Sequence, residues 1–143
     1  MTIEALYYFH AFLNRELFDG DLEAVIIKRF DDRTPDNYNG TLSQIETETD
    51  PFIIFFASSL FGDDPVFTIT VLLHEMIHQY NRQRGIEDID EDTGEHNGAF
   101  KRAAACHGLE MGGYALTTET ETRIKEQLKN YDYMQRHRKE PCF

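Results

Sequence analysis

The feature that most constrains this chain is its most apolar helical segment, LLHEMIHQY at residues 72–80, which carries two histidines and a glutamate. Upstream, Asp64 is suited to cap a helix that begins at Pro65, a position that tolerates the missing N–H of proline. Apolar residues beyond this proline cover so much of the circumference that only a narrow strip can meet solvent. Gly85 suits the left-handed conformation that ends many helices. We therefore predict a central core helix over residues 65–84.

The polar side chains within this helix form the pattern H-E-x-x-H. His74 and His78 are four residues apart, so their rings project from one face about 40° out of register and can meet at one point. Buried imidazole and carboxylate groups without partners would cost much of a small domain's stability. The spacing is typical of zinc hydrolases, in which both histidines bind Zn²⁺ and the glutamate acts on its bound water. We therefore predict one catalytic Zn²⁺, with Glu75 as the catalytic residue.

A third zinc ligand must come from elsewhere in the chain, because catalytic zinc usually has three protein ligands and one open position. A histidine six residues after the second is excluded, since position 84 is arginine. Glu95, His96 and His107 remain as candidates. His96 follows Gly94 at the expected start of a helix, where the chain can fold back. We choose His96, and Glu95 is the alternative because some H-E-x-x-H enzymes use a glutamate.

Upstream of the core helix, the sequence predicts one helix and a small sheet. Apolar residues at helical spacing indicate an amphipathic helix over residues 3–18. Turn residues at Asn39-Gly40 and Asp50-Pro51 separate the β-rich segments, so we expect neighbouring strands to pair as antiparallel hairpins. The expected strands cover about residues 24–30, 41–47 and 52–57. The predicted fold class is α+β, with the core helix packed on a three-stranded sheet.

Downstream of the core helix lies an acidic stretch, EDIDED, at residues 87–92. Its alternating aspartates suggest a calcium loop, but Thr93 and Ala99 stand where such a loop needs glycine and glutamate. We therefore interpret the stretch as a solvated acidic loop. The expected elements beyond it are a helix from about His96 to Gly108, a short extended segment around Tyr114 and a last helix from Thr117 or Thr118.

Length and composition indicate a single domain over residues 1–143, with a basic tail at about 135–143. Cys106 and Cys142 do not form a C-x-x-C pair, which favours a reducing compartment. The N-terminus lacks the features of a signal peptide, and no apolar run is long enough to cross a membrane. We therefore expect a cytoplasmic protein without a membrane partner.

Two segments, HEMIHQY and GEHNGAFKR, together resemble the SprT-like metalloprotease domain of the Spartan type, in which a third histidine stands in an H-G-x-x-F setting. LNRELFDGDLEAVII is similar to that family's passage from first helix to first strand, so the resemblance covers most of residues 5–110. It implies a minimal zincin fold, zinc bound by His74, His78 and His96, and a catalytic Glu75.

The sequence departs from that family at two points. Asn97 precedes Gly98, where the family often has glycine directly after the histidine, although Phe100 keeps its distance from His96. The four-cysteine zinc ribbon or basic DNA-binding segment of many members has no counterpart in this sequence. With a net charge of −12, we expect weak or absent DNA binding by this chain.

The motif and the resemblance predict a zinc-dependent endopeptidase that acts on protein or peptide substrates, with DNA-associated proteins as one substrate class. An extended substrate is expected along a strand edge, at residues 52–57 or 41–47. Tyr114, Tyr80 and His107 are candidate donors to the oxyanion. Two alternatives remain open: a noncatalytic domain in which zinc holds the fold for partner binding, and a zinc hydrolase of a non-peptide amide.

Overall fold

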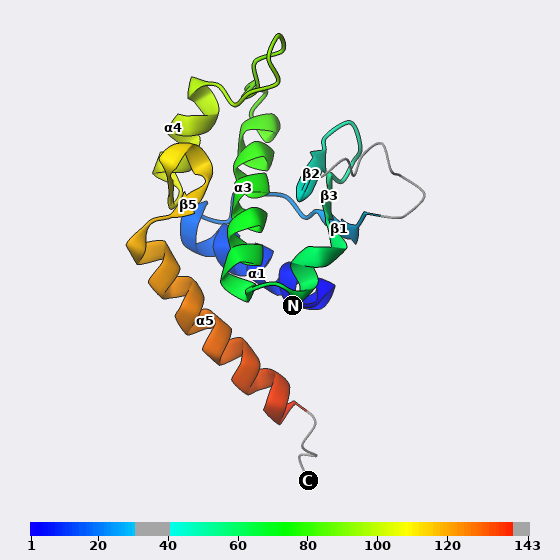
Figure 1. The fold of residues 1–143 in the computed structure, drawn as a ribbon, viewed down its shortest axis with the longest axis vertical. Coiled ribbons are helices and arrows are strands. Elements are labelled where there is room, and N and C mark those ends of the chain that lie inside the picture. Colours follow the sequence, from blue (N-terminus) through cyan, green and yellow to red (C-terminus); the bar gives the residue numbers. More distant parts are fainter. Residues whose placement is uncertain (31–40, 139–143) are drawn as a thin grey trace.

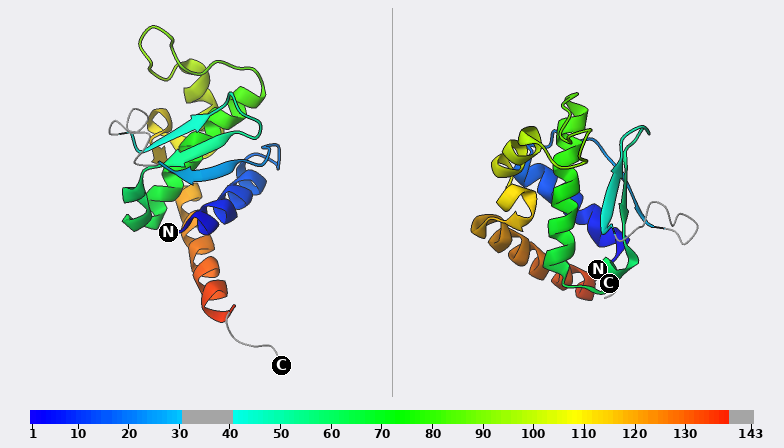
Figure 2. Two further views of the ribbon diagram at one scale, coloured as in Figure 1. Left: turned by 90° about the vertical axis from the view of Figure 1, so that its right-hand side faces the viewer. Right: turned by 45° about the horizontal axis from the view of Figure 1, so that its top comes forward.

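The computed structural model of the chain describes residues 1–30 and 41–138. It has an α+β fold, as predicted, in which α3 lies between a three-stranded sheet on one side and α4 with a short hairpin on the other (Figures 1 and 2). The elements in chain order are α1 (Ile3–Leu17), β1 (Ile26–Arg29), β2 (Ser43–Glu46), β3 (Ile53–Phe56), the 3-10 helix η1 (Ser58–Gly62), α3 (Pro65–Gln83), α4 (Gly98–Cys106), β4 (Leu109–Glu110), the 3-10 turn η2 (Met111–Gly113), β5 (Ala115–Leu116) and α5 (Thr118–His137).

The central helix α3 begins and ends where the sequence predicts. Asp64 caps it by accepting a hydrogen bond from the backbone N–H of Val66 at 3.1 Å. At the other end Gly85 has a φ of +69°, and the N–H of Ile86 returns to the carbonyl of Asn81 at 2.9 Å. Its fully buried apolar side chains, which form the middle of the core, are Ile69, Leu72, Leu73, Met76 and Ile77. Burial of this face stabilises the helix far more than its local propensity does.

The sheet has the order β1-β3-β2, which corrects half of the predicted strand pairing. The antiparallel β2–β3 hairpin is confirmed, but β1 pairs in parallel with β3 rather than with β2. The physical reason is the composition of the strands. β3 buries Ile54 and Phe56 and takes the centre, whereas β1 ends in the exposed Lys28 and Arg29 and takes an edge. The predicted turn at Asn39-Gly40 lies outside the described residues.

This order also corrects one of the two expected substrate edges. β3 is paired on both sides, so residues 52–57 offer no free edge. β2, within the segment predicted at 41–47, is an edge strand of the described sheet, and it packs beside α3. A substrate that extends the sheet therefore has β2 as its available partner next to the central helix.

Downstream of α3 the predicted helices form with small shifts. α4 begins at Gly98 rather than His96, because the side chain of Asn97 caps it by accepting from the N–H groups of Ala99 and Phe100 at 2.9 and 3.2 Å. The expected extended segment around Tyr114 is a hairpin of β4 and β5, closed by η2. The last helix begins at Thr118, as predicted.

α5 carries the C-terminal part of the described chain away from the body of the fold (Figure 2). At its end Arg138 contacts Glu4 at 2.8 Å. The remainder of the predicted basic tail, residues 139–143 with Cys142, lies outside the described residues. Among the helices that the structure describes, none has both the length and the apolar character needed to cross a membrane.

A buried polar chain joins α1 to α3. The ring Nε2 of His10 lies 2.9 Å from Oε1 of Gln79, and the amide nitrogen of Gln79 donates to the carbonyl of Glu23 at 2.8 Å and to Gln83 at 2.9 Å. Burial lowers the pKa of His10 below its ordinary 6.5, although the hydrogen bond with Gln79 opposes this shift. His10 is therefore a packed residue of the interface between α1 and α3.

This burial predicts a pH-dependent stability. Because the pKa of His10 is lower in the folded chain, the unfolded chain binds more protons once the pH falls below about 6.5, and stability is lost there. This group contributes at most about 1.4 kcal/mol per pH unit. His10→Gln keeps a hydrogen-bond donor but replaces the titrating imidazole by an amide, so the free energy of unfolding of this variant should fall less steeply as the pH is lowered. Urea unfolding at neutral and mildly acidic pH measures this, with the exposed His137→Gln as control. Equal slopes for His10→Gln and the unsubstituted chain would contradict it.

Candidate metal centre

Three histidines converge at the side of α3 that faces α4. His74 and His78 come from α3, and His96 comes from the loop that precedes α4. Their ring centroids are 5.3, 4.8 and 5.0 Å apart, and one ring nitrogen of each lies within 4.8 Å of the other two. Within residues 1–30 and 41–138 this is the one group of three or more histidine, cysteine or acidic side chains placed to hold a metal ion. Glu95, the alternative third ligand, is exposed and lies outside the group.

The second nitrogen of each ring has a partner outside the cluster. Nδ1 of His74 donates to the carbonyl oxygen of Gly113 at 2.9 Å, because a carbonyl can only accept. Nδ1 of His78 lies 2.7 Å from Oδ2 of Asp88, and Nδ1 of His96 lies 3.0 Å from the hydroxyl of Tyr114. Metal-binding histidines almost always hold their other nitrogen in this way. The Nε2 atoms are therefore the ones left for an ion.

The electrostatics of the cluster favour neutral imidazoles, the form that binds metals. Burial lowers the pKa of His74 to about 4, although the hydrogen bond to the carbonyl of Gly113 opposes this shift, and the neighbouring His78 and His96 lower the pKa by smaller amounts. Burial and the proximity of His78 also lower the pKa of His96. These two rings therefore have lone pairs available near neutral pH, with no proton to displace.

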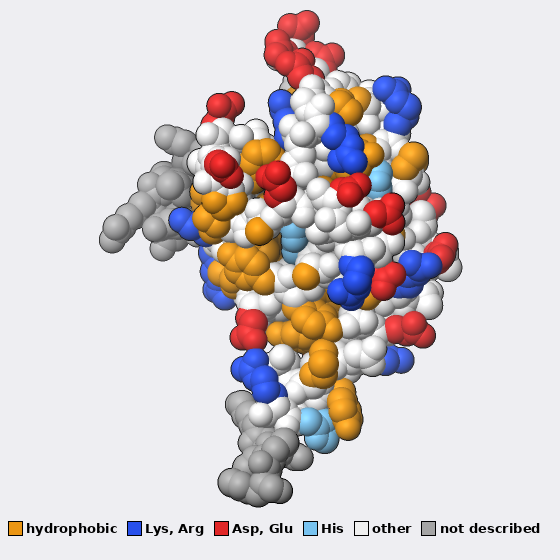
Figure 3. Space-filling model, turned by 180° about the vertical axis from the view of Figure 1, so that it is seen from behind, with side chains coloured by type: hydrophobic (Ala, Val, Ile, Leu, Met, Phe, Trp, Pro, Cys, Tyr) orange, Lys and Arg blue, Asp and Glu red, His pale blue; other side chains and the backbone are white. Residues whose placement is uncertain are grey.

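Asp88 is a buried residue of the candidate site that the sequence does not predict. The predicted solvated loop is correct for its exposed tip at Asp90, Glu91 and Asp92, where acidic side chains gather (Figure 3). Asp88 instead is 0% exposed, because its carboxylate turns inward to His78 and to the amide of Asn81 at 3.0 Å. The one signal in the sequence is that an apolar residue, Ile89, interrupts the acidic run directly after it.

The charge of Asp88 is held by these neighbours. Burial alone would raise its pKa, but the hydrogen bonds from His78 and Asn81 and the charge of Arg82 together lower it. Nε of Arg82 lies 3.9 Å from Oδ1, an oxygen that has no hydrogen-bond partner among the described residues. The side chain therefore acts as a fixed anion that orients His78.

The aromatic ring of Phe100 packs against all three imidazoles. Its ring centroid lies 4.9 Å from that of His74, 4.5 Å from that of His78 and 4.1 Å from that of His96, which it stacks on. Gly113 approaches the same ring so closely that a Cβ there would lie 2.4 Å from Cε2 of Phe100, and its φ is +99°. Only glycine fits this position, where its carbonyl also holds His74.

Glu75 lies beside the cluster and lines a cleft that the three histidines also line. The cleft has a volume of about 330 Å³ and is lined by the three histidines, Glu75 and residues of β2. Oε2 of Glu75 accepts a hydrogen bond from the hydroxyl of Ser43 on β2 at 2.9 Å. Burial raises the pKa of Glu75 despite the opposing effects of His78 and Ser43. The carboxylate is therefore more basic than an exposed one.

Of the three candidate oxyanion donors, the structure brings one to the site. Tyr114 is 68% exposed, and its ring lies 5.2 Å from that of His74. Tyr80 and His107 instead pack on each other at 4.4 Å, and His107 stacks on Phe18 at 4.5 Å. These two residues belong to the packing between α1, α3 and α4.

Loss of the Asp88 carboxylate should weaken metal binding. In Asp88→Asn the partner of His78 is neutral and less able to keep that ring oriented and electron-rich, so we expect the affinity for Zn²⁺ to fall about 10- to 100-fold. Competition with a chromophoric chelator measures it. Asp92→Asn, at the exposed tip of the same loop, makes the same charge change and should leave the affinity unaltered. Equal affinities of the two variants would remove Asp88 from the site.

The third ligand can be tested by comparing neighbours. His96→Ala removes a ring nitrogen from the cluster, whereas Glu95→Ala removes an exposed carboxylate, so the first should weaken Zn²⁺ binding far more. The same chelator competition ranks the two variants. If Glu95→Ala lost the metal while His96→Ala kept it, the site would be of the two-histidine, one-glutamate type.

The sequence matches no protein-family model. A search of curated proteins also returns no significant match. Support for a function therefore comes from the residues of the site and from the motif that builds it.

Proposed function

We propose that this chain is a zinc-dependent endopeptidase with a zincin fold, similar to the SprT-like metalloproteases. One Zn²⁺ is held by His74, His78 and His96, and Glu75 is the catalytic base. The observation that carries the proposal is the arrangement of three converging imidazoles, each with its other nitrogen engaged, beside a buried carboxylate on the same cleft. This is the donor set and the neighbouring base that catalytic zinc sites use.

The ligand set favours zinc catalysis over a purely structural zinc. Structural zinc sites are closed by four protein ligands, most often with cysteines, whereas catalytic sites use three and keep one position open. The described part of the chain supplies three histidines here and no fourth metal-binding side chain in the group. Cys106, the cysteine in that part, is exposed and is not in the group. A noncatalytic domain is therefore the less favoured alternative.

In the proposed reaction the chain's own residues position and transfer protons. A bound Zn²⁺ supplies Lewis acidity and a water whose pKa is near 7. The Glu75 carboxylate accepts the proton of the attacking water and delivers it to the departing amine, and the hydrogen bond from Ser43 holds it in place. Gly113, Asp88 and Tyr114 keep the three imidazoles oriented.

An extended peptide is the substrate class that the cleft favours. β2 is an edge strand, and the cleft over Glu75 follows it from Thr41 to Thr47. A substrate strand that pairs with this edge places its backbone carbonyls next to the cluster. A small non-peptide amide would leave most of this length empty, so peptide hydrolysis is the better supported reaction.

We also propose that DNA binding by this chain is weak. Affinity for DNA comes mainly from lysines and arginines that neutralise phosphates, and this chain has a net charge of −12. The exposed acidic tip at Asp90, Glu91 and Asp92 adds local repulsion beside the loop of His96. DNA-associated proteins would then be reached through another partner. A cytoplasmic location is likewise proposed from the sequence.

Glu75→Gln should retain zinc and lose hydrolysis. The amide oxygen can still accept from Ser43, so the fold and the ligands are unchanged, but the proton acceptor is gone. We expect turnover of a quenched peptide mixture to fall at least about 100-fold. Metal content is measured on the same sample, and the exposed Glu91→Gln is the control. Loss of zinc would make Glu75 a ligand, and undiminished turnover would exclude it from catalysis.

A further inference from the structure

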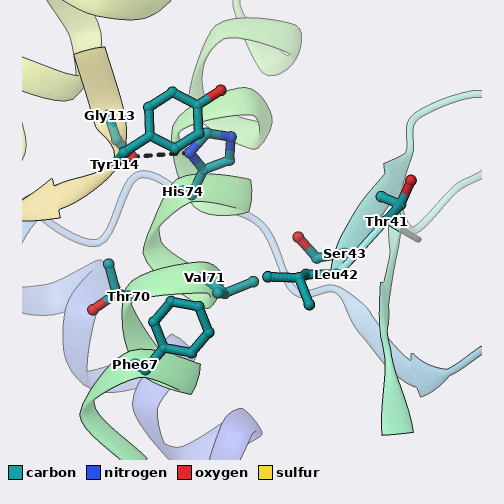
Figure 4. Close-up of a pocket in the computed structure, with 9 residues that line it drawn as sticks. All are labelled: Thr41, Leu42, Ser43, Phe67, Thr70, Val71, His74, Gly113 and Tyr114. Carbon is teal, nitrogen blue, oxygen red and sulfur yellow. Dashed lines mark hydrogen bonds between the residues drawn. The ribbon is translucent and has the colours of Figure 1, made fainter. Parts of the chain in front are cut away.

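We propose that a second pocket, directly beside the histidine cluster, selects a large apolar side chain on the substrate residue that follows the scissile bond. This inference rests on the proposed peptidase function and names its specificity. The pocket has a volume of about 260 Å³, and Figure 4 shows its lining, which includes Leu42, Phe67, Val71, His74 and Tyr114.

The apolar lining of this pocket is exposed to solvent. Leu42, just before β2, is 42% exposed, and Phe67, in the first turn of α3, is 41% exposed. The side chains of Leu42 and Val71 point toward each other from opposite sides, with the ring of Phe67 beside them (Figure 4). Exposed apolar groups that face one another across a hollow are favourable contacts for an apolar group that enters it.

Polar groups on three of the lining residues are already hydrogen-bonded. The hydroxyl of Ser43 donates to Glu75 at 2.9 Å, that of Thr70 donates to the carbonyl of Val66 at 2.7 Å, and Nδ1 of His74 is bonded to Gly113. Among residues 1–30 and 41–138, no charged side chain lines this pocket. An entering charge would therefore lose its hydration without gaining a partner, which disfavours acidic and basic residues.

The size of the pocket matches a single large side chain. An apolar cavity of about 150 Å³ holds a benzene molecule. The 260 Å³ of this pocket therefore accommodates the side chain of leucine, methionine or phenylalanine. Glycine and alanine would fill little of it and would gain correspondingly less from burial.

The direction of the strands assigns the side of the scissile bond. The pocket shares Thr41, Ser43 and His74 with the cleft over Glu75, so the two hollows adjoin. It lies at the start of β2, whereas the cleft continues along the strand. A substrate that pairs antiparallel, the slightly more stable mode, runs toward the start of β2 as it proceeds to its own C-terminus. The pocket therefore receives the residue on the C-terminal side of the bond.

The first experiment measures kcat/KM of the zinc-loaded full chain on quenched peptides that differ only in the residue after the scissile bond, with the cut mapped by mass spectrometry. Leucine and phenylalanine should exceed aspartate and glycine by at least about tenfold. Leu42→Lys places a cation at the pocket and should lower the leucine-to-aspartate ratio by at least about tenfold. Met134→Lys on α5, 44% exposed, is the matched control and should leave the ratio unaltered.

The second experiment separates the pocket from the peptidase activity. Two succinyl hydroxamate methylamides, with either an isobutyl group or a hydrogen on the carbon next to the amide, are titrated into the zinc-loaded chain. The isobutyl compound should bind at least about tenfold more tightly, and Leu42→Lys should reduce this difference.

The outcomes distinguish the two proposals. Cleavage without a side-chain preference, a preference on the N-terminal side of the bond, or a preference that Leu42→Lys leaves intact overturns the pocket while the peptidase function stands. If no peptide is cut, the proposed function fails, and the hydroxamate pair still decides the pocket. Equal affinity of the two hydroxamates overturns it.

Discussion

The hydrogen bond between Nδ1 of His78 and Oδ2 of Asp88 is the interaction on which the rest of the site depends. At 2.7 Å and fully buried on the aspartate side, it ties the acidic loop to α3. The backbone carbonyl of Asp88 then accepts from the N–H of Asn97 at 3.0 Å, and Asn97 caps α4. A bridge between Ile89 and His96 completes the connection. The Asp88 side chain thereby orients His78 of α3, and the backbone around Asp88 positions the segment that carries His96.

Convergence of the three histidines is a tertiary effect. His74 is hydrogen-bonded to the carbonyl of Gly113 in η2, and all three imidazole rings pack against Phe100 of α4. Segments far apart in the chain therefore position the three histidines together. Gly113 also constrains Phe100, since any side chain at the glycine would displace the Phe100 ring. Substitution at Gly113 would therefore move the imidazoles through two contacts at once.

What the sequence predicts well is local in origin. The cap at Asp64, the apolar face of α3 and the ending at Gly85 each depend on residues within a turn or two, and the structure has all three. Strand pairing is not local, because β3 takes the centre through the burial of its side chains and leaves β1 parallel beside it. The burial of Asp88 is likewise not predictable from the sequence, because it depends on Asn81 and His78, which only the fold places beside it.

The two carboxylates near the cluster have opposite electrostatic environments, and this difference fits the separate roles proposed for them. Asp88 receives hydrogen bonds from His78 and Asn81 and lies near Arg82, which together lower its pKa. Among the described residues Glu75 receives one hydrogen bond, from Ser43, and its burial raises its pKa. A carboxylate stabilised as an anion is a poor proton acceptor, whereas a poorly stabilised one takes up a proton readily. Glu75 is therefore suited to exchange protons with a substrate, and Asp88 to remain charged and hold its histidine.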